Sequence, residues 1–365
     1  MPPAKSALAG TAPQIKRLEE PFVGHQQIWH QLTKTELFPA LLFSGPSGIG
    51  KKMVALQFAT YLNCQNQQAG QPACLPAHAT SEMCSSCRRI YGSNHPDVRI
   101  WAREEGKLSL GIGEMRELID QSATHNYEAQ FRVNIIDEAH TLTEEAQNAL
   151  LKTLEEPNAR QLLVMITQRA ESLIPTIRSR CRSHRFQSLP AGLTQQYLED
   201  RAVEPIQAKL LAHLCEGCLG TALDLAQHPS AWNVQEEVFD RLATLPGQNL
   251  WNSLESAKSL EVLKVESDSS SFASSRLSAE YQLSLVRLWL IDLMRLNQAG
   301  PELVVLEHRL SDLTPLAASN RVQAILGLLE KLHLWQQSLQ SNVNPRFVWQ
   351  NLCISLARDL CPASK

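Results

Sequence analysis

A glycine-rich loop with two lysines is the part of the sequence whose chemistry is easiest to read. The segment ALLFSGPSGIGKK spans residues 40–52 and contains the pattern Gly-x-x-x-x-Gly-Lys. Glycines let successive backbone N–H groups turn toward an anion, and a helix that starts behind the loop adds positive potential. The pattern therefore predicts a P-loop that binds the phosphates of a nucleotide such as ATP through Gly45, Gly48, Gly50 and Lys51.

The residue after Lys51 departs from this pattern. A P-loop normally continues with Ser or Thr, whose hydroxyl holds a magnesium ion, but the sequence has Lys52 there. The substitution removes a group that stabilises the transition state of phosphoryl transfer. Lys52 can still neutralise part of the phosphate charge, so we expect ATP and Mg²⁺ as candidate cofactors, with binding better preserved than turnover.

Two adjacent carboxylates follow a second apolar segment, Arg132–Ile136. Asp137 and Glu138 come directly after this predicted strand. Parallel strands deliver such groups to the carboxyl edge of a sheet, where ligands bind in open α/β folds. We expect Asp137 to hold magnesium, directly or through water, and Glu138 to polarise the attacking water. The P-loop and the acidic strand end together predict a P-loop NTPase fold.

Four cysteines follow the helix behind the P-loop. Cys64, Cys74, Cys84 and Cys87 supply the four thiolates that a closed tetrahedral zinc site needs. The residues between them include little apolar material, so a bound metal would supply the missing folding energy. All four positions are filled by protein, which predicts a structural Zn²⁺ site and not a catalytic one. His78 lies between these cysteines and is an alternative to Cys74 as a ligand.

The remaining pattern predicts how these groups are positioned. A further apolar segment, residues 161–167, ends in Thr167 at the same sheet edge. Thr141 to Glu144 is a capping box that predicts the start of the helix that follows it. We expect a five-stranded parallel sheet with strands at 40–44, 95–101, 132–136, 161–167 and 182–186. Helical periodicity prevails from residue 189 onward. The expected division is an AAA+-type P-loop domain at 1–187 (zinc insertion 64–87), a three-helix lid domain at 188–230 and an all-α collar domain at 231–365.

Composition excludes several classes of protein. The chain has 365 residues, 34 basic and 37 acidic side chains and a net charge of −3, so no global charge field indicates nucleic-acid binding. No apolar run approaches the roughly 20 residues of a membrane span. We therefore expect a cytoplasmic protein with no membrane association. Nine cysteines, an odd number spread unevenly, fit metal binding and buried thiols better than a disulfide framework.

Several longer motifs resemble the clamp-loader branch of the AAA+ ATPases. They are Asp137 to His140, then Asn148 to Pro157, then Ser179-Arg180-Cys181, with Asn344-Pro345-Arg346 near the end. The four cysteines resemble those that bind zinc in bacterial members. The resemblance implies a hetero-pentamer with the other clamp-loader subunits (gamma/tau and delta). This assembly opens a sliding clamp and places it on primed DNA. The resemblance also gives Arg180 the role of completing the ATP site of a neighbouring subunit.

Three departures separate the chain from the motor subunit (gamma/tau) of that ring. Lys52 replaces the hydroxyl residue, and the turn Gly217–Gly220 is followed by Thr221 and Ala222 where the family offers a sensor arginine. The chain also ends soon after the helical region. These features favour a non-motor subunit with a degenerate nucleotide site.

Three alternatives remain. The nearest is a catalytically active motor subunit, which keeps Asp137 and Glu138 in their usual roles. A zinc-dependent DNA-binding module fits poorly, since the cysteine segment has few basic residues before Arg88 and no aromatic residue before Tyr91. A small-molecule P-loop kinase is disfavoured, because the long helical C-terminal half of the chain would have no obvious role in such an enzyme.

Overall fold

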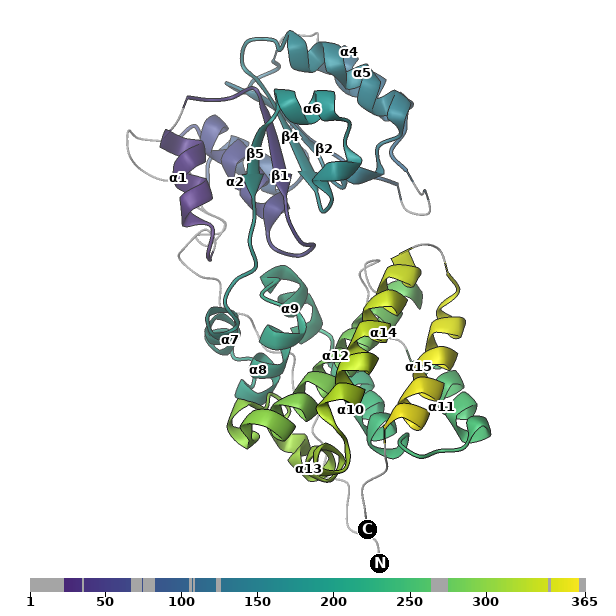
Figure 1. Ribbon diagram of the computed structural model, residues 1–365. Helices are drawn as coiled ribbons and strands as arrows, with labels where there is room; N and C mark the ends of the chain where they lie inside the picture. Colours follow the sequence, from purple (N-terminus) through teal and green to yellow (C-terminus); the bar gives the residue numbers. More distant parts are fainter. Residues whose placement is uncertain are drawn as a thin grey trace, which may run out of the picture. The chain divides into compact units, whose positions relative to one another are not determined.

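A computed structural model describes residues 23–34, 36–66, 74, 83–104, 107, 109–122, 126–263, 275–340 and 343–360 (Figure 1). Contacts between residues divide the chain into two units. The P-loop unit holds the described residues up to Pro190 and the short segment Gly217–Thr221. The helical unit holds Ala191–Glu216 and the described residues from Ala222 onward.

The P-loop unit is built on the five-stranded parallel sheet that the sequence predicts. The spatial order is β2-β3-β4-β1-β5, and every neighbouring pair is parallel. The three inner strands β1, β3 and β4 are almost entirely buried, as expected for a parallel sheet covered on both faces. The edge strands β2 and β5 are only partly buried. Their bounds are β1 Ala40–Ser44, β2 Val98–Trp101, β3 Arg132–Ile136, β4 Gln161–Thr167 and β5 Arg182–Arg185.

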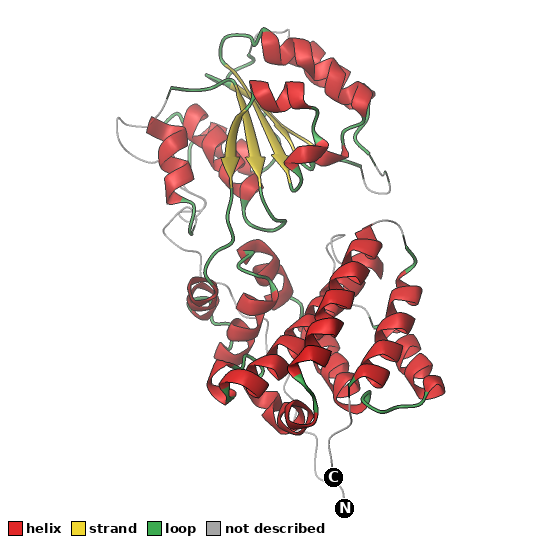
Figure 2. Ribbon diagram, in the orientation of Figure 1, coloured by secondary structure: helices red, strands yellow, loops and turns green. Residues whose placement is uncertain are grey.

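Helices cover both faces of this sheet (Figure 2). Alternate strand residues point to opposite sides, so Phe43 packs with α2 and α3 in one core, whereas Leu42 packs with α4, α5 and α6 in the other. This arrangement holds the carboxyl ends of β1, β3 and β4 at one rigid edge. The helices are α1 Gln26–Lys34, α2 Lys51–Asn63, α3 Ser85–Tyr91, α4 Ile112–Ser122, α5 Glu144–Glu155 and α6 Pro175–Arg180.

The predicted cap of α5 is wrong by two residues. Thr141 lies in a 3-10 turn (η2, Ala139–Thr141), and its hydroxyl donates to the carbonyl of Glu138. Thr143 caps the helix, because its Oγ1 accepts the N–H of Ala146 at 3.2 Å. The extra turn after β3 shifts the helix start toward the C-terminus.

The helical unit contains no β-strand among its described residues, as its periodicity predicts. Phe239 stacks on the buried Trp289 in its core, with ring centroids 5.6 Å apart. In the part of the chain that the structure describes, no helix is long and apolar enough to cross a membrane. The helices are α7 Ala191–Glu199, α8 Pro205–Leu214, α9 Leu219–Ala226, α10 Pro229–Thr244, α11 Leu250–Val262, α12 Ser275–Ala299, α13 Leu310–Ser319, α14 Val322–Gln340 and α15 Pro345–Asp359.

The proposed division into domains at 1–187, 188–230 and 231–365 stays a prediction. The contacts define two units, and the boundary near Pro190 lies close to the predicted end of the first domain. The serine-rich composition of residues 264–275 predicts a loop, and this segment lies outside the described residues apart from Ser275, which begins α12; His78 also lies outside them.

Candidate functional site

A cavity of about 610 Å³ lies at the carboxyl edge of the sheet in the P-loop unit. Its size falls in the range of small-molecule sites. The structure brings most of the predicted nucleotide-site residues into its lining: Gly48, Gly50, Lys51, Lys52, Asp137, Glu138 and Thr167. Gly45 is not part of the lining. A Cβ there would lie 2.5 Å from the carbonyl oxygen of Phe186, the residue after β5, so this close approach requires glycine.

The segment Gly217–Thr221 closes against the P-loop. The N–H of Gly220 donates to the carbonyl of Gly48 at 2.7 Å. Gly48 has a φ of +68°, and a Cβ on it would lie 2.0 Å from Oγ1 of Thr221. Glycine is therefore required at position 48 both for its backbone conformation and for this contact.

Lys51 is buried and already bonded to the loop that it follows. Its Nζ donates to the carbonyls of Gly45, at 2.7 Å, and of Pro46. Burial lowers the pKa of this lysine to about 8, although the nearby Cys218 and Asp137 oppose the shift. Phosphate oxygens entering the loop would have to compete with these two carbonyls for the ammonium group.

Lys52 forms an ion pair with the first of the two acids. Its Nζ lies 3.2 Å from Oδ2 of Asp137, while Oδ1 of Asp137 accepts the N–H of Glu138 at 3.0 Å. Both carboxylate oxygens are thus engaged within the chain. Magnesium needs oxygen ligands in octahedral geometry. The residues present do not fit this ion, because position 52 has no hydroxyl and the ammonium group of Lys52 is paired with the carboxylate of Asp137.

The second acid is also paired. Nε of Arg103 lies 3.4 Å from Oε2 of Glu138, and Glu138 has the left-handed backbone conformation (φ 50°). The hydroxyl of Thr167, at the end of β4, donates to the carbonyl of Arg169 at 3.0 Å and accepts its N–H at 3.1 Å. The polar groups expected to act on water or on phosphate are therefore occupied by partners from the same chain.

Three further polar residues at or next to this cavity, Arg103, His140 and Tyr91, are not among the site residues that the sequence predicts. Arg103 follows the last residue of β2 by two positions. Because parallel strands end at the same edge of the sheet, this position could have indicated that Arg103 lies near the site. His140 and Tyr91 line the cavity, and neither Nδ1 of His140 nor the hydroxyl of Tyr91 has a hydrogen-bond partner within the described structure. Burial lowers the pKa of His140 and raises that of Tyr91 to about 12.

Arg180 ends α6 and is not among the residues that line the cavity. Its Nη2 donates to Oε1 of Glu155 at 2.6 Å, and its Nη1 donates to the carbonyl of Thr176 at 3.1 Å. The side chain remains 35% exposed. The guanidinium is thus oriented by α5 while part of it stays open to solvent.

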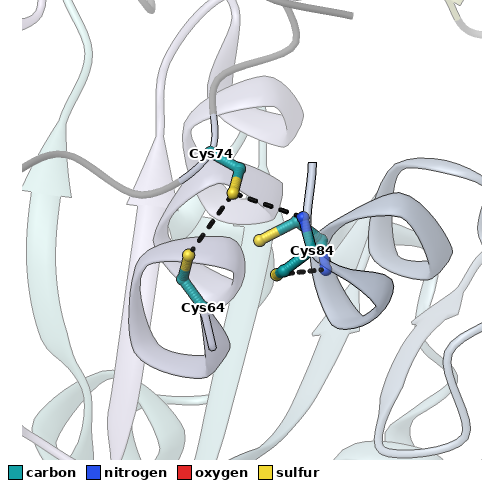
Figure 3. A group of neighbouring side chains, drawn as sticks. Cys64, Cys74 and Cys84 are labelled. Carbon is teal, nitrogen blue, oxygen red and sulfur yellow. Dashed lines mark hydrogen bonds between the residues drawn. The ribbon is translucent and has the colours of Figure 1, made fainter. Parts of the chain in front are cut away.

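The four cysteines of the predicted metal site come together, as the sequence indicates. Their Sγ atoms all lie within 4.8 Å of one another. Figure 3 shows Cys64, at the end of α2, facing Cys74 and the start of α3. Sγ of Cys64 lies 3.7 Å from Sγ of Cys74, which accepts the N–H of Cys84 at 3.5 Å. A cluster of four sulfur donors is the set that tetrahedral zinc prefers.

The electrostatics of this cluster differ from one thiol to the next. Burial opposes ionisation of Cys84, but hydrogen bonds, first of all from the N–H of Cys87, lower its pKa to about 7. Cys87 lies deeper, and burial raises its pKa. Metal binding would deprotonate all four thiols. The cluster can hold a metal, and zinc remains the predicted ion.

Comparison with known proteins places these features in context. A sequence profile described as "DNA polymerase III, delta subunit" matches residues 24–190. Subunit delta' of DNA polymerase III from Escherichia coli (strain K12) is 28% identical over 88% of this chain and 90% of its own length. The delta' subunit from Bacillus subtilis (strain 168) is 26% identical over 90% of this chain and 94% of its own length. The tau subunit of the same E. coli strain is 33% identical, but over 53% of this chain and 29% of its own length.

Proposed function

Because the chain is a relative of the bacterial delta' subunits of DNA polymerase III along most of its length, we propose that it is the non-motor subunit of a clamp loader. In this role it joins gamma/tau and delta subunits in a ring that places a sliding clamp on primed DNA. Its own nucleotide site does not turn over ATP. It contributes to hydrolysis by giving Arg180 to the ATP site of a neighbouring subunit.

The pairing of both acids within the chain carries this proposal. Phosphoryl transfer depends on positioning and on charge stabilisation, which a metal-holding carboxylate, a water-polarising group and an arginine supply. Here Lys52 engages Asp137 and Arg103 engages Glu138. Loss of one arginine of this type alone can cost about 10³-fold in rate. An active motor would have to release both carboxylates and also replace the sensor arginine.

The position of Arg180 supports a role outside its own subunit. An arginine that acts on a neighbour's phosphate must be exposed and yet already oriented. The 2.6 Å bond to Glu155 orients the guanidinium, and the exposed part of the side chain is available to a partner. When the neighbouring subunit binds, the phosphate of its nucleotide would compete with the carboxylate of Glu155 for Nη2 of Arg180. The guanidinium would then bind the phosphate in place of the carboxylate.

Reconstitution tests the proposal. The chain is mixed with gamma/tau and delta subunits, sliding clamp and primed DNA from the same organism, and loaded clamps are counted with and without it. We expect stable assembly and loading that depends on the chain. Loading at an equal rate when the chain is omitted would refute the proposed function.

A further inference from the structure

We propose that Lys52 takes the place of the magnesium ion in the P-loop cavity, so that the chain binds a nucleoside triphosphate without a divalent metal. This inference rests on the proposed degenerate nucleotide site. It adds to that proposal the class of ligand, a nucleoside triphosphate, and its metal-free form.

The geometry puts the ammonium group of Lys52 where a P-loop protein normally holds the metal. Lys52 is the second residue of α2, directly after the lysine of the P-loop. Its ammonium group lies 3.2 Å from Asp137, the acid at the end of β3, and the side chain is 50% exposed. It lines the same cavity as Gly48, Gly50 and Lys51. One positive charge therefore already bridges the acid and the space in which phosphates would lie.

A magnesium ion would meet two obstacles in this cavity. It would have to displace the ammonium group from Asp137, and it would then lie beside that same charge, where like charges repel strongly at short distance. The missing hydroxyl also removes a ligand for which water would have to substitute. A metal-free triphosphate avoids both obstacles, because its negative charge is met by Lys51, Lys52 and the loop N–H groups.

The rest of the cavity favours a nucleoside over inorganic phosphate. Met53 and Leu56 of α2, Tyr91 of α3 and Ile166 of β4 contribute apolar lining. An apolar wall beside a phosphate-binding loop gives a base a surface to pack on. The volume of about 610 Å³ leaves room for base and sugar as well as phosphates.

Equilibrium binding of a fluorescent ATP analogue to the purified full chain tests the inference. Fluorescence anisotropy is measured in buffers freed of divalent ions by a chelating resin, with and without added Mg²⁺. Soluble chelators are avoided because they would also remove metal from the cysteine cluster. We expect the wild-type chain to bind in metal-free buffer, with an affinity that Mg²⁺ leaves unchanged or weakens.

Variants at position 52 make the test specific to the charge. Lys52→Thr should bind the analogue about tenfold more weakly in metal-free buffer and recover affinity when Mg²⁺ is added. Lys52→Arg should keep metal-free binding. Lys107→Thr removes an exposed lysine outside the cavity lining and serves as the matched control. Circular dichroism melting checks that each variant is folded.

Two results would overturn the inference: wild-type binding that requires Mg²⁺, and no binding in either buffer. The assay uses the chain alone, so either failure leaves the clamp-loading test to be decided separately. Equally, a failure in clamp loading would not alter the binding result.

Discussion

Lys52 and Asp137 form an ion pair, with Nζ 3.2 Å from Oδ2, at the point where a P-loop protein normally has a hydroxyl residue and a metal-holding acid. The pair changes the meaning of the Asp-Glu sequence after β3. Read alone, Asp137 and Glu138 indicate a hydrolytic site. Lys52 and Arg103 pair with these two acids, and we therefore expect a cavity that binds phosphates without hydrolysing them.

The first prediction concerns turnover by the isolated chain. With both acids paired, Mg-ATP should be hydrolysed no faster than in buffer alone, as followed by phosphate release over many equivalents of ATP. Steady turnover that disappears when Lys51 is replaced would contradict this expectation. The chain would then be a working motor despite Lys52.

The second prediction concerns the cysteine cluster. Purified chain should contain one zinc ion, measured by elemental analysis, because four Sγ atoms converge within 4.8 Å. Cys87→Ser should lose the metal and lower the unfolding temperature, since metal binding adds folding energy. Cys353→Ala, at a buried cysteine outside the cluster, should keep the zinc. A folded chain free of metal would rule out the zinc assignment.

The third prediction concerns a buried ion pair at the amino ends of β2 and β3. The side chain of Asp97 is fully buried and accepts N–H bonds from residues 127–129 at 2.8–3.0 Å. It also lies 3.1 Å from Nη2 of Arg132. Asp97→Asn should lower the free energy of unfolding by about 3–5 kcal/mol, because it leaves Arg132 buried without its counter-charge. Chemical denaturation at neutral pH measures the difference.

The pH dependence of that difference has a definite sign. Burial opposes ionisation of Asp97, but the backbone N–H bonds and Arg132 outweigh it and lower its pKa in the folded state. The stabilisation is therefore complete above the unfolded pKa of about 3.9 and is lost as the pH falls through the lower folded pKa. Glu117→Gln, which breaks the exposed pair with Arg99, should cost less than about 1 kcal/mol. Equal losses in the two variants would contradict the argument.

Much of the P-loop unit could be predicted from the sequence because its signals are local. Apolar runs bounded by polar turns gave the strands, and β4 spans the predicted residues 161–167. The positions of Asp137 and Thr167 followed from the rule that parallel strands end at one edge. The four cysteines were close enough in sequence for their spacing to suggest a shared site.

Other features depend on tertiary contacts and could not be predicted in this way. The ion pair between Arg103 and Glu138 connects the loops that follow β2 and β3. The pattern of apolar and polar residues along the chain does not indicate which side chains pair in this way. The cap of α5 was misplaced because the 3-10 turn at Ala139–Thr141 leaves no clear composition signal. Helix α13 keeps Pro315 in its interior, a residue that normally argues against a helix at its position.

The most direct measurement is the ATPase rate of the reconstituted clamp loader containing Arg180→Ala in this chain. We expect the assembly to form, as checked by gel filtration, and its rate to fall, since one motor site loses an arginine that stabilises transferred charge. Arg178→Ala, an exposed arginine of the same helix, should leave the rate unchanged. An intact assembly that hydrolyses ATP equally fast with Arg180→Ala would contradict the assignment of this residue to its neighbour's site.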